Sequence, residues 1–242
     1  MIAPGAAELR PLRPADLPAV RRLFRDTVAM GDPLPFDLPG LAAYEALCLD
    51  WYLGPGRGAA AVLADGDDVL GYALVCLDNR AYRRWAVPAA LSWAAGAAGR
   101  ALTGGLRGPA ATFVRLRLAD GLAAWRGGPP EPAPAHAHVN VVRGARRGAG
   151  FRLVGHVDRT CAAAGLPGWF AEMNAPVGRR ALAVARLHGH VLHRAPNRTL
   201  SWLAGEPVER LTLLRRLAEL PPADLAPADL APATRGRHPG RS

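Results

Sequence analysis

The sequence has 242 residues, of which 50% are apolar, 21% are charged and 6% are aromatic. This apolar fraction excludes a wholly disordered chain, and the length suits one domain with or without an insertion. The formal net charge is +10, but lysine is absent, so all 30 cationic side chains are arginines. Because a lysine-free sequence rich in alanine, arginine, glycine and proline is typical of a GC-rich genome, the basic balance alone does not indicate a polyanionic partner.

Cysteine usage and the N-terminus bear on the cellular compartment. The three cysteines, Cys48, Cys76 and Cys161, form no C-x-x-C pair. This sparse, odd count argues against a disulfide framework or a thiolate zinc site and fits a reducing cytoplasm. The N-terminus lacks a basic start followed by an apolar run, which argues against a secretory signal. The most apolar stretch, residues 85–106, is mostly alanine and glycine, so we predict a soluble helical insertion in a cytoplasmic protein, with an interfacial helix as the alternative.

In chain order, the first half shows strand and helix patterns interrupted by one segment of different character. The patterns predict a strand at 9–14, helices at 16–30 and 41–53, and a hairpin of strands at 59–64 and 69–77. From 78 to 134 the strand rhythm is lost, and two helical stretches lead to a linker rich in glycine and proline. We therefore predict a helical insertion at 78–134 within one domain.

The second half returns to alternating strands and helices. We predict a strand at 136–142, a loop rich in glycine and arginine, a helix ending near Gly165, a strand at 169–173, a helix from Pro176 to Gly189, and strands at 191–194 and 208–214. The last part, residues 220–242, repeats short Ala-Asp-Leu-Ala-Pro units and ends rich in arginine, glycine and proline. We expect this tail to be disordered.

The most informative segment is the loop between the predicted strand at 136–142 and the helix after it. Its sequence is Arg143-Gly144-Ala145-Arg146-Arg147-Gly148-Ala149-Gly150. Glycines let the backbone bend so that consecutive N–H groups point inward, and the start of a helix adds a positive dipole end. The pattern predicts a site for phosphate oxygens; a glycine-rich turn with solvated arginines is the alternative.

This loop resembles a signature of the GNAT-type acyl-CoA N-acyltransferases, in which Q/R-x-x-G-x-G/A follows a central strand and precedes a helix. Residues 145–150 depart from it at the first position, where alanine replaces Gln or Arg, a charge that Arg143 or Arg146 would have to supply. The order of the predicted elements also matches the family over about residues 7–217, apart from the insertion. The resemblance implies a single GNAT-like α/β (α+β) domain, with a mixed, mostly antiparallel central sheet flanked by helices.

The resemblance also implies a co-substrate, acetyl-CoA or another acyl-CoA, because loop amides of the family hold the pyrophosphate of coenzyme A. The implied cofactor-binding residues are Val139, Asn140, Val141, Arg143, Ala145, Arg146, Arg147, Gly148, Ala149, Gly150 and Asn174. The loop is not the G-x-G-x-x-G of a dinucleotide-binding fold, and a P-loop would require a lysine.

Acidic residues gather in the N-terminal part of the chain. Between Asp26 and Gly56 there are five acidic residues and no arginine. A site that joins a polyanionic cofactor to a cationic amine needs such polarity. In the family the two N-terminal helices and their connection form part of the acceptor pocket, so Asp32 and Asp37 are the predicted ligands of a small-molecule or peptide amine. A solvated acidic face is the alternative.

The candidate catalytic residues lie on two predicted strands. His136, His138 and Asn140 alternate and therefore share one strand face. His138, whose ordinary pKa is about 6.5, is the predicted base that removes the amine proton, and Glu172 is the second candidate. Structural roles for both are the alternative. The tyrosine that often protonates the leaving thiolate in the family is replaced by Ala185, but a thiol pKa of about 8.5 lets the thiolate leave without an acid.

These observations predict direct transfer of an acetyl or short acyl group from acyl-CoA to an amine. The alternative is a GNAT-fold module that binds CoA with little or no turnover, since two positions of the family pattern are lost. No metal, nucleic acid or membrane partner is expected, because no carboxylate or thiolate completes the His-x-His pairs and no basic stripe interleaved with aromatic residues occurs. A monomer and a homodimer both fit the sequence.

Overall fold

The protein is described by a computed structural model over residues 7–127, 131–145 and 148–225. Its helices and strands, in chain order, are β1 (Glu8–Pro11), α1 (Leu17–Thr27), α2 (Leu41–Leu53), β2 (Ala61–Asp65), β3 (Asp68–Cys76), α3 (Asn79–Leu102), α4 (Gly108–Gly127), β4 (Ala135–Val141), α5 (Ala149–Ala163), β5 (Gly168–Pro176), α6 (Arg179–His188), β6 (His190–Pro196), α7 (Arg198–Ala204), β7 (Val208–Arg216) and α8 (Pro222–Leu225). Most of the predicted tail, residues 226–242, lies outside the described residues.

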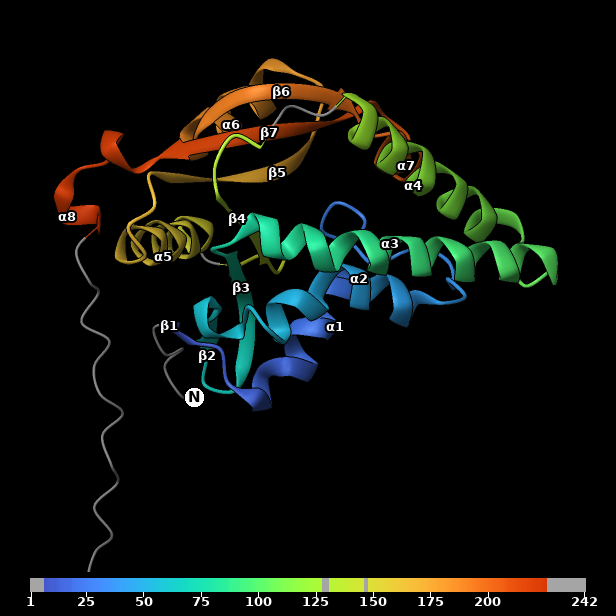
Figure 1. The fold of residues 1–242 in the computed structure, drawn as a ribbon, viewed down its shortest axis with the longest axis horizontal. Coiled ribbons are helices and arrows are strands. Elements are labelled where there is room, and N and C mark those ends of the chain that lie inside the picture. The colour runs from blue at the N-terminus through green and yellow to red at the C-terminus, as the bar shows by residue number, and fades with distance from the viewer. Residues whose placement is uncertain (1–6, 128–130, 146–147, 226–242) are drawn as a thin grey trace, which may run out of the picture.

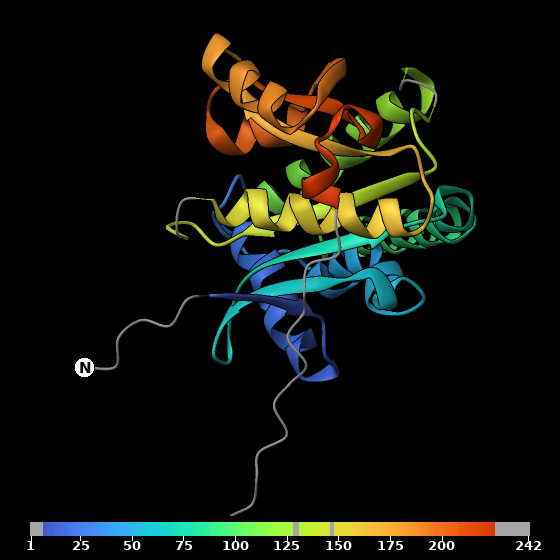
Figure 2. The same ribbon diagram turned by 90° about the vertical axis from the view of Figure 1, so that its left-hand side faces the viewer.

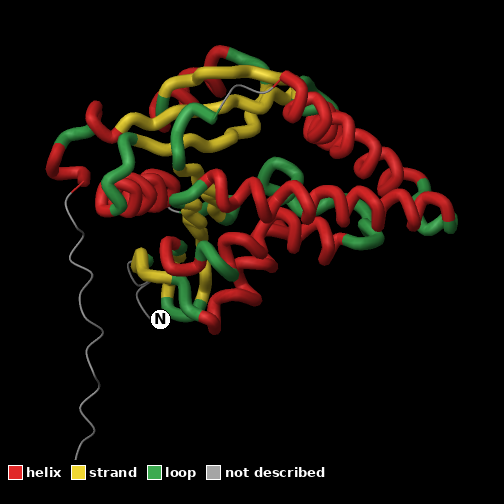
Figure 3. The backbone as a smooth tube through the Cα atoms, viewed as in Figure 1, coloured by secondary structure: helices red, strands yellow, loops and turns green. Residues whose placement is uncertain are grey.

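The strands form a seven-stranded sheet in the order β1-β2-β3-β4-β5-β7-β6. Neighbouring strands pair antiparallel except β4 and β5, which are parallel. Figure 3 shows the strands, in yellow, passing through the molecule with helices, in red, around them. The structure therefore confirms the predicted mixed, mostly antiparallel sheet flanked by helices.

Helices cover both faces of the sheet. On one face α1, α2 and the α3–α4 pair bury an aromatic-rich core that includes Phe24, Tyr44, Tyr72 and Phe113. On the other face α5 buries a second core against β3 and β4. Figure 2 shows α5, in yellow, lying in front of the strands. The spacing of the apolar residues in α5, at helical period, explains why this helix packs along one stripe.

The segment predicted as an insertion folds into two helices: α3 leads away from the sheet and α4 returns at an angle to it (Figure 1). α4 is held to α7 by Asp120, whose carboxylate accepts hydrogen bonds from the N–H groups of Arg198 (3.1 Å) and Thr199 (2.9 Å) and from the Thr199 hydroxyl (2.7 Å). The helical pair is therefore anchored to the second half of the sheet through the start of α7. Within the described ranges, no helix is long and apolar enough to span a bilayer.

Some element boundaries differ from the sequence-based predictions. Pro176 does not open a helix: it ends β5, opposite Val208 of β7, and α6 starts only at Arg179. α1 stops at Thr27 rather than near residue 30, because Met30 adopts a left-handed φ of 61°. α7 was not predicted at all.

A core substitution in α5 tests the second core. Leu153 is fully buried (0% exposed), whereas Phe151 on the same helix is 53% exposed. We expect Leu153→Ala to lower the free energy of unfolding by about 2–5 kcal/mol, because it removes buried methyl groups and leaves a cavity. Phe151→Ala is the matched control and should change the urea midpoint little. Equal losses in the two variants would contradict this packing of α5.

Candidate functional site

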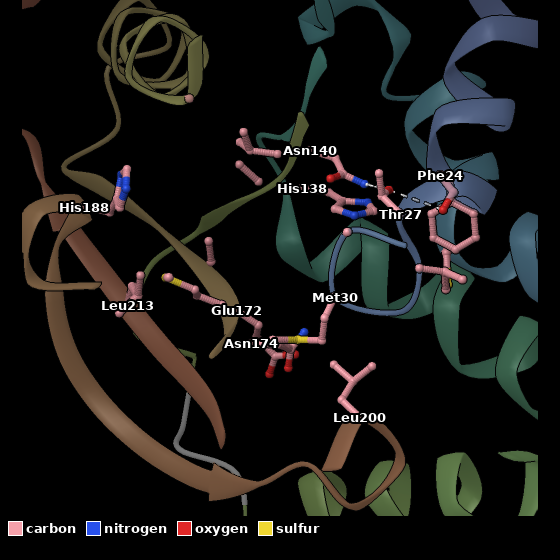
Figure 4. Close-up of a pocket in the computed structure, with 18 of the residues that line it drawn as sticks. Phe24, Thr27, Met30, His138, Asn140, Glu172, Asn174, His188, Leu200 and Leu213 are labelled. Atoms are coloured by element: carbon pink, nitrogen blue, oxygen red, sulfur yellow. Dashed lines mark hydrogen bonds between the residues drawn. The ribbon is translucent and has the colours of Figure 1, made fainter. Parts of the chain in front are cut away.

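A cleft opens where β4 and β5 separate. The two parallel strands pair only at Ala135–Trp169 and His136–Phe170. Farther along, β4 continues to pair with β3 and β5 with β7, so each strand remains in the sheet while their facing edges diverge. A cavity of about 510 Å³ borders residues 137–140 of β4 and residues 171–174 of β5 (Figure 4).

The main chain of β4 directs polar groups into this cleft. In an antiparallel ladder, the N–H and C=O groups of successive residues alternate between the two sides. The Val142 N–H donates to the Leu70 carbonyl at 2.9 Å, so Val142 faces β3, and by alternation Val139 and Val141 face β5. The Asn140 side-chain oxygen accepts the Val141 N–H at 3.0 Å. Val139 therefore directs its main-chain N–H toward the middle of the cleft.

The start of α5 borders the same cavity. Gly148 caps the helix with a φ of 90°, a conformation that favours glycine. The first intrahelical hydrogen bond runs from the Arg152 N–H to the Gly148 carbonyl at 3.0 Å, which leaves the N–H groups of Ala149, Gly150 and Phe151 without an intrahelical acceptor. Gly150 lines the cavity, so the positive end of the α5 dipole lies next to it.

The loop before α5 agrees only in part with the prediction. The Ala145 N–H is used in a turn, donating to the Val142 carbonyl at 3.2 Å. Arg146 and Arg147 lie outside the described residues. Arg143 forms an ion pair of 2.8 Å with Asp32, and its side chain is 69% exposed. The part of the predicted phosphate site that lies against the cavity is therefore the backbone at the start of α5.

The two predicted acidic ligands do not line the cavity. Asp32 is paired with Arg143, and its side chain is 55% exposed. Asp37 is also exposed. The structure instead brings Met30 and Gly31, from the same connection between α1 and α2, to the cavity wall.

His138 lies on β4 and lines the cavity from the side of α1 and α2 (Figure 4). Its ring is surrounded by aromatic rings, with centroid distances of 5.5 Å to Tyr72, 6.2 Å to Phe24 and 6.3 Å to Tyr52. Burial lowers the pKa of His138 to about 4. The ring is therefore neutral at pH 7. Among the described residues no group hydrogen-bonds to it, which leaves one ring nitrogen available as a proton acceptor.

His136 shares the face of His138 but lies outside the cavity. Its Nε2 is 2.6 Å from the Tyr52 hydroxyl, and its ring packs against Tyr82 at a centroid distance of 4.5 Å. Burial, followed by the influence of His138, lowers the pKa of His136 to about 4. These contacts assign His136 a structural role, holding β4 to α2 and α3.

The Asn140 side chain joins β4 to α1. Its Nδ2 donates to the Thr27 hydroxyl, which in turn donates to the Leu23 carbonyl at 2.7 Å. A longer contact of 3.4 Å reaches the Tyr72 hydroxyl. Asn140 therefore fixes the distance between β4 and α1 at the cavity wall.

Two polar side chains line the cavity from β5. Glu172 has one carboxylate oxygen 3.5 Å from Arg210 Nε, and its side chain is 50% exposed. The Asn174 side-chain oxygen accepts a hydrogen bond from Asn197 at 2.8 Å. Figure 4 shows His138 and Glu172 on opposite sides of the cavity. The structure thus places His138 of β4 and the two β5 residues, Glu172 and Asn174, at one cavity.

Several cavity residues were not predicted from the sequence. They come from α1, α2, α4 and α7 and include Phe24, Tyr44, Cys48, Phe113, Arg117 and Leu200. Tyr44 with Cys48, and Phe113 with Arg117, are each four residues apart on one helix, so each pair shares a helix face. This spacing is visible in the sequence, but it does not show which face meets the sheet. The helical pair α3–α4 therefore contributes to the cavity through α4.

Ala185, which replaces the family tyrosine, is fully buried in a small apolar cluster between α6 and the sheet. In the parts of the chain that the structure describes, no group of three or more His, Cys, Asp or Glu side chains is arranged to hold a metal ion.

No family model and no curated protein matches the sequence. Among solved structures, SsHAT is similar over 89% of this chain and 100% of its own, with 22% identity and a TM-score of 0.53. The yncA protein of Salmonella typhimurium, solved with its cofactor acetyl-CoA, is similar over 89% and 96% of the two chains, with 15% identity and a TM-score of 0.48. A GCN5-related N-acetyltransferase from Kribbella flavida is similar over 88% and 99%, with 18% identity and a TM-score of 0.47.

Three features define the fold of the described residues: the strand order, the parallel pair that diverges, and the strand–loop–helix unit from β4 to α5. The similarity to SsHAT extends over both chains and shows a common fold, although identity is low. The chain therefore shares the fold of SsHAT, and its sheet is the mixed, mostly antiparallel one expected from the resemblance to the GNAT-type acyltransferases.

The lowered histidine pKa values predict acid sensitivity of the fold. The unfolded chain takes up protons at His136 and His138 near pH 6.5, and the folded protein only near pH 4. The unfolded state therefore binds more protons between these values, and the free energy of unfolding falls as the pH is lowered through this range, by up to about 3 kcal/mol for each histidine.

Urea denaturation at pH 7.5 and at pH 4.5 measures this loss. In His138→Gln the difference between the two pH values should be smaller than in the wild type. His156 and His188, whose pKa values are also lowered by burial, are common to both proteins and cancel. An unchanged difference would contradict a buried, neutral His138.

Proposed function

We propose that the protein transfers an acetyl or short acyl group from acyl-CoA to an amine by direct attack on the thioester. The observation that carries this proposal is the divergence of β4 from β5 around one cavity, with the start of α5 beside it. The cleft offers a main-chain edge for an extended thioester arm, and the helix start offers N–H groups for phosphate oxygens.

In this proposal the cofactor lies across the cleft. The N–H groups of Ala149, Gly150 and Phe151 hold the pyrophosphate, and the left-handed Gly148 lets the backbone approach it closely. The Val139 N–H faces the cleft and polarises the thioester carbonyl, so that it stabilises the oxyanion as the amine attacks. Binding both reactants in one cavity removes most of the entropic cost of their encounter.

His138 is the proposed base. The amine enters as its neutral form, which burial among aromatic side chains favours over the ammonium form. Attack makes the amine nitrogen positively charged and more acidic than a free ammonium ion, and the neutral His138 ring accepts its proton, directly or through water. Glu172, across the cavity, is the second candidate for this step. The CoA thiolate then leaves without protonation by the protein, because its conjugate thiol has an ordinary pKa of about 8.5.

A second candidate function is a CoA-binding module with little or no turnover. It is favoured by Ala185, which is buried and carries no proton donor where the family often has a tyrosine. A direct assay separates the two functions: release of free thiol from acetyl-CoA in the presence of amines indicates transfer, whereas binding without release indicates the module.

We also propose that residues 7–217 form one acyltransferase domain with an insertion at 78–134, and that the protein acts in the cytoplasm. The cytoplasmic location is proposed from the sparse, isolated cysteines Cys48, Cys76 and Cys161, which form no C-x-x-C pair.

A charge placed at the start of α5 tests the cofactor site. Gly148→Glu should raise the Kd for CoA at least about 100-fold, which corresponds to about 2.7 kcal/mol, because a carboxylate and its side chain would face the pyrophosphate. Isothermal titration calorimetry with CoA measures this effect.

Gly165→Glu is the matched control for this variant. Gly165 follows the other end of α5, also has a positive φ (69° against 90°), and like Gly148 has open space beside it. Both variants place a side chain at a positive φ, and the added charge is less favourable at the C-terminal end of the helix. CoA binding should nevertheless survive in Gly165→Glu. Equal affinities in the two variants would overturn the cofactor site.

A substitution of His138 tests the base. His138→Gln should lower kcat about 100-fold or more while leaving the Kd for CoA unchanged, because it removes the proton acceptor and keeps a polar side chain. After correction for the fraction of neutral amine, the wild-type rate should show no inflection near pH 6.5, since His138 becomes protonated only near pH 4.

His193→Gln, on β6 and outside this cavity, is the control and should retain wild-type kcat. If His138→Gln keeps the wild-type rate and pH profile, the base is another group, and Glu172→Gln becomes the next variant to measure.

A further inference from the structure

Arg117 of α4 extends the site on the side away from the proposed cofactor position. It lines the cavity, and its guanidinium carbon lies 5.6 Å from the centre of the Tyr44 ring. Tyr44 packs against Phe24 at 6.2 Å, and Phe24 packs against His138 at 6.2 Å. Arg117 is therefore connected to the proposed base by two aromatic rings on the same wall of the cavity.

The nearby carboxylates are already used by other groups. Asp120, one turn along α4, accepts three hydrogen bonds from the start of α7. Glu45, next to Tyr44 on α2, pairs with Arg21 at 2.8 Å and Arg25 at 2.6 Å. Among the described residues, no carboxylate forms an ion pair with Arg117. A guanidinium keeps its charge in proteins, so a positive charge without an acidic partner faces the cavity.

The second arginine at the cavity wall is in a different situation. Arg215 Nε lies 2.8 Å and 2.9 Å from the two carboxylate oxygens of Asp158, which is fully buried. Its charge is therefore neutralised within the protein. Arg117 is the cavity-lining guanidinium that has an aromatic support and no described carboxylate partner.

A ligand carboxylate would compensate this charge. Withdrawing a charge from water without a partner costs several kcal/mol, and a guanidinium binds a carboxylate through two parallel hydrogen bonds. The cavity that Arg117 lines is also bordered by apolar side chains, among them Phe24, Val28 and Phe113. The wall thus combines one anion-binding group with space for an apolar body.

We propose that the acceptor is an amine that also carries a carboxylate, an amino acid with an apolar side chain, bound in the cavity with its carboxylate on Arg117. This inference rests on the proposed acyl transfer and specifies its acceptor. It also replaces the expectation that acidic side chains hold the acceptor, since neither Asp32 nor Asp37 reaches the cavity.

The test uses matched sets of amines with acetyl-CoA, with thiol release as the measurement. The sets are L-phenylalanine, L-phenylalaninamide and phenethylamine, and L-leucine, L-leucinamide and isopentylamine. In the wild type, kcat/KM for the free amino acid should exceed that for its amide and for its decarboxylated amine at least tenfold. Arg117→Gln should abolish this preference, mainly by raising KM, and Arg117→Lys should restore part of it.

Arg115→Gln is the matched control, because Arg115 lies on the same helix and is exposed. It should keep the wild-type preference. The melting temperature of Arg117→Gln should fall only slightly, because the substitution removes the cation–π contact with Tyr44 but breaks no ion pair. A loss of stability with an unchanged preference would assign Arg117 a structural role and overturn the inference.

Other outcomes separate this inference from the proposed function. If all members of a set react equally, or if Arg117→Gln keeps the preference for the free amino acid, the acceptor proposal fails while acyl transfer stands. If no amine reacts, the proposal of acyl transfer fails. Calorimetry of L-phenylalanine and L-leucine with the CoA-loaded protein then tests whether Arg117 binds a ligand carboxylate. Binding that Arg117→Gln weakens at least tenfold supports it, and absence of binding to the wild type overturns it.

Discussion

The divergence of two parallel strands inside a continuous sheet is the constraint on which the rest of the structure depends. β4 is held along its length by β3, and β5 by β7, so neither strand needs the other beyond their first two paired residues. The N–H and C=O groups on the facing edges of β4 and β5 therefore point into a cavity instead of forming hydrogen bonds between the two strands. Because backbone N–H and C=O groups need partners, such an opening in mid-sheet is a site for a ligand that offers amide-like groups along its length.

The helices around the cleft keep it open and set its chemistry. Asn140 holds β4 to α1 through Thr27, and Asp120 holds α4 to the start of α7. These polar contacts fix the walls, while aromatic rings from α1, α2 and α4 fill the space between them. The same rings partly bury His138, and this burial lowers its pKa, so that the ring stays neutral over the whole physiological range.

Local sequence signals were enough for the central unit of the fold. The alternation at 136–140, the glycines that follow and the helical period of α5 are all short-range features, and the structure has the strand, the capping Gly148 and the helix in that order. Structural features that depend on contacts with residues far away in the sequence could not be predicted from such local signals. Pro176 is compatible with a helix start, but it ends β5 because it lies opposite Val208 of a strand about 30 residues away.

The pairing of charges at the site also depends on residues far apart in the chain and could not be predicted from the sequence. The distribution of charges along the sequence predicted acidic residues at one end of the site and arginines at the other. In the structure, however, Asp32 forms an ion pair with Arg143. Both side chains are exposed, so this ion pair contributes little to stability. Whether a charged side chain can act on the cavity depends on whether another group of the protein already neutralises it. Asp120, Glu45 and Asp158 are buried and fully engaged by donors within the protein, so they cannot turn toward a ligand. Arg117 has aromatic support without such a carboxylate, and the polarity of the acceptor side of the cavity is therefore positive, opposite to the polarity that the acid-rich segment predicts.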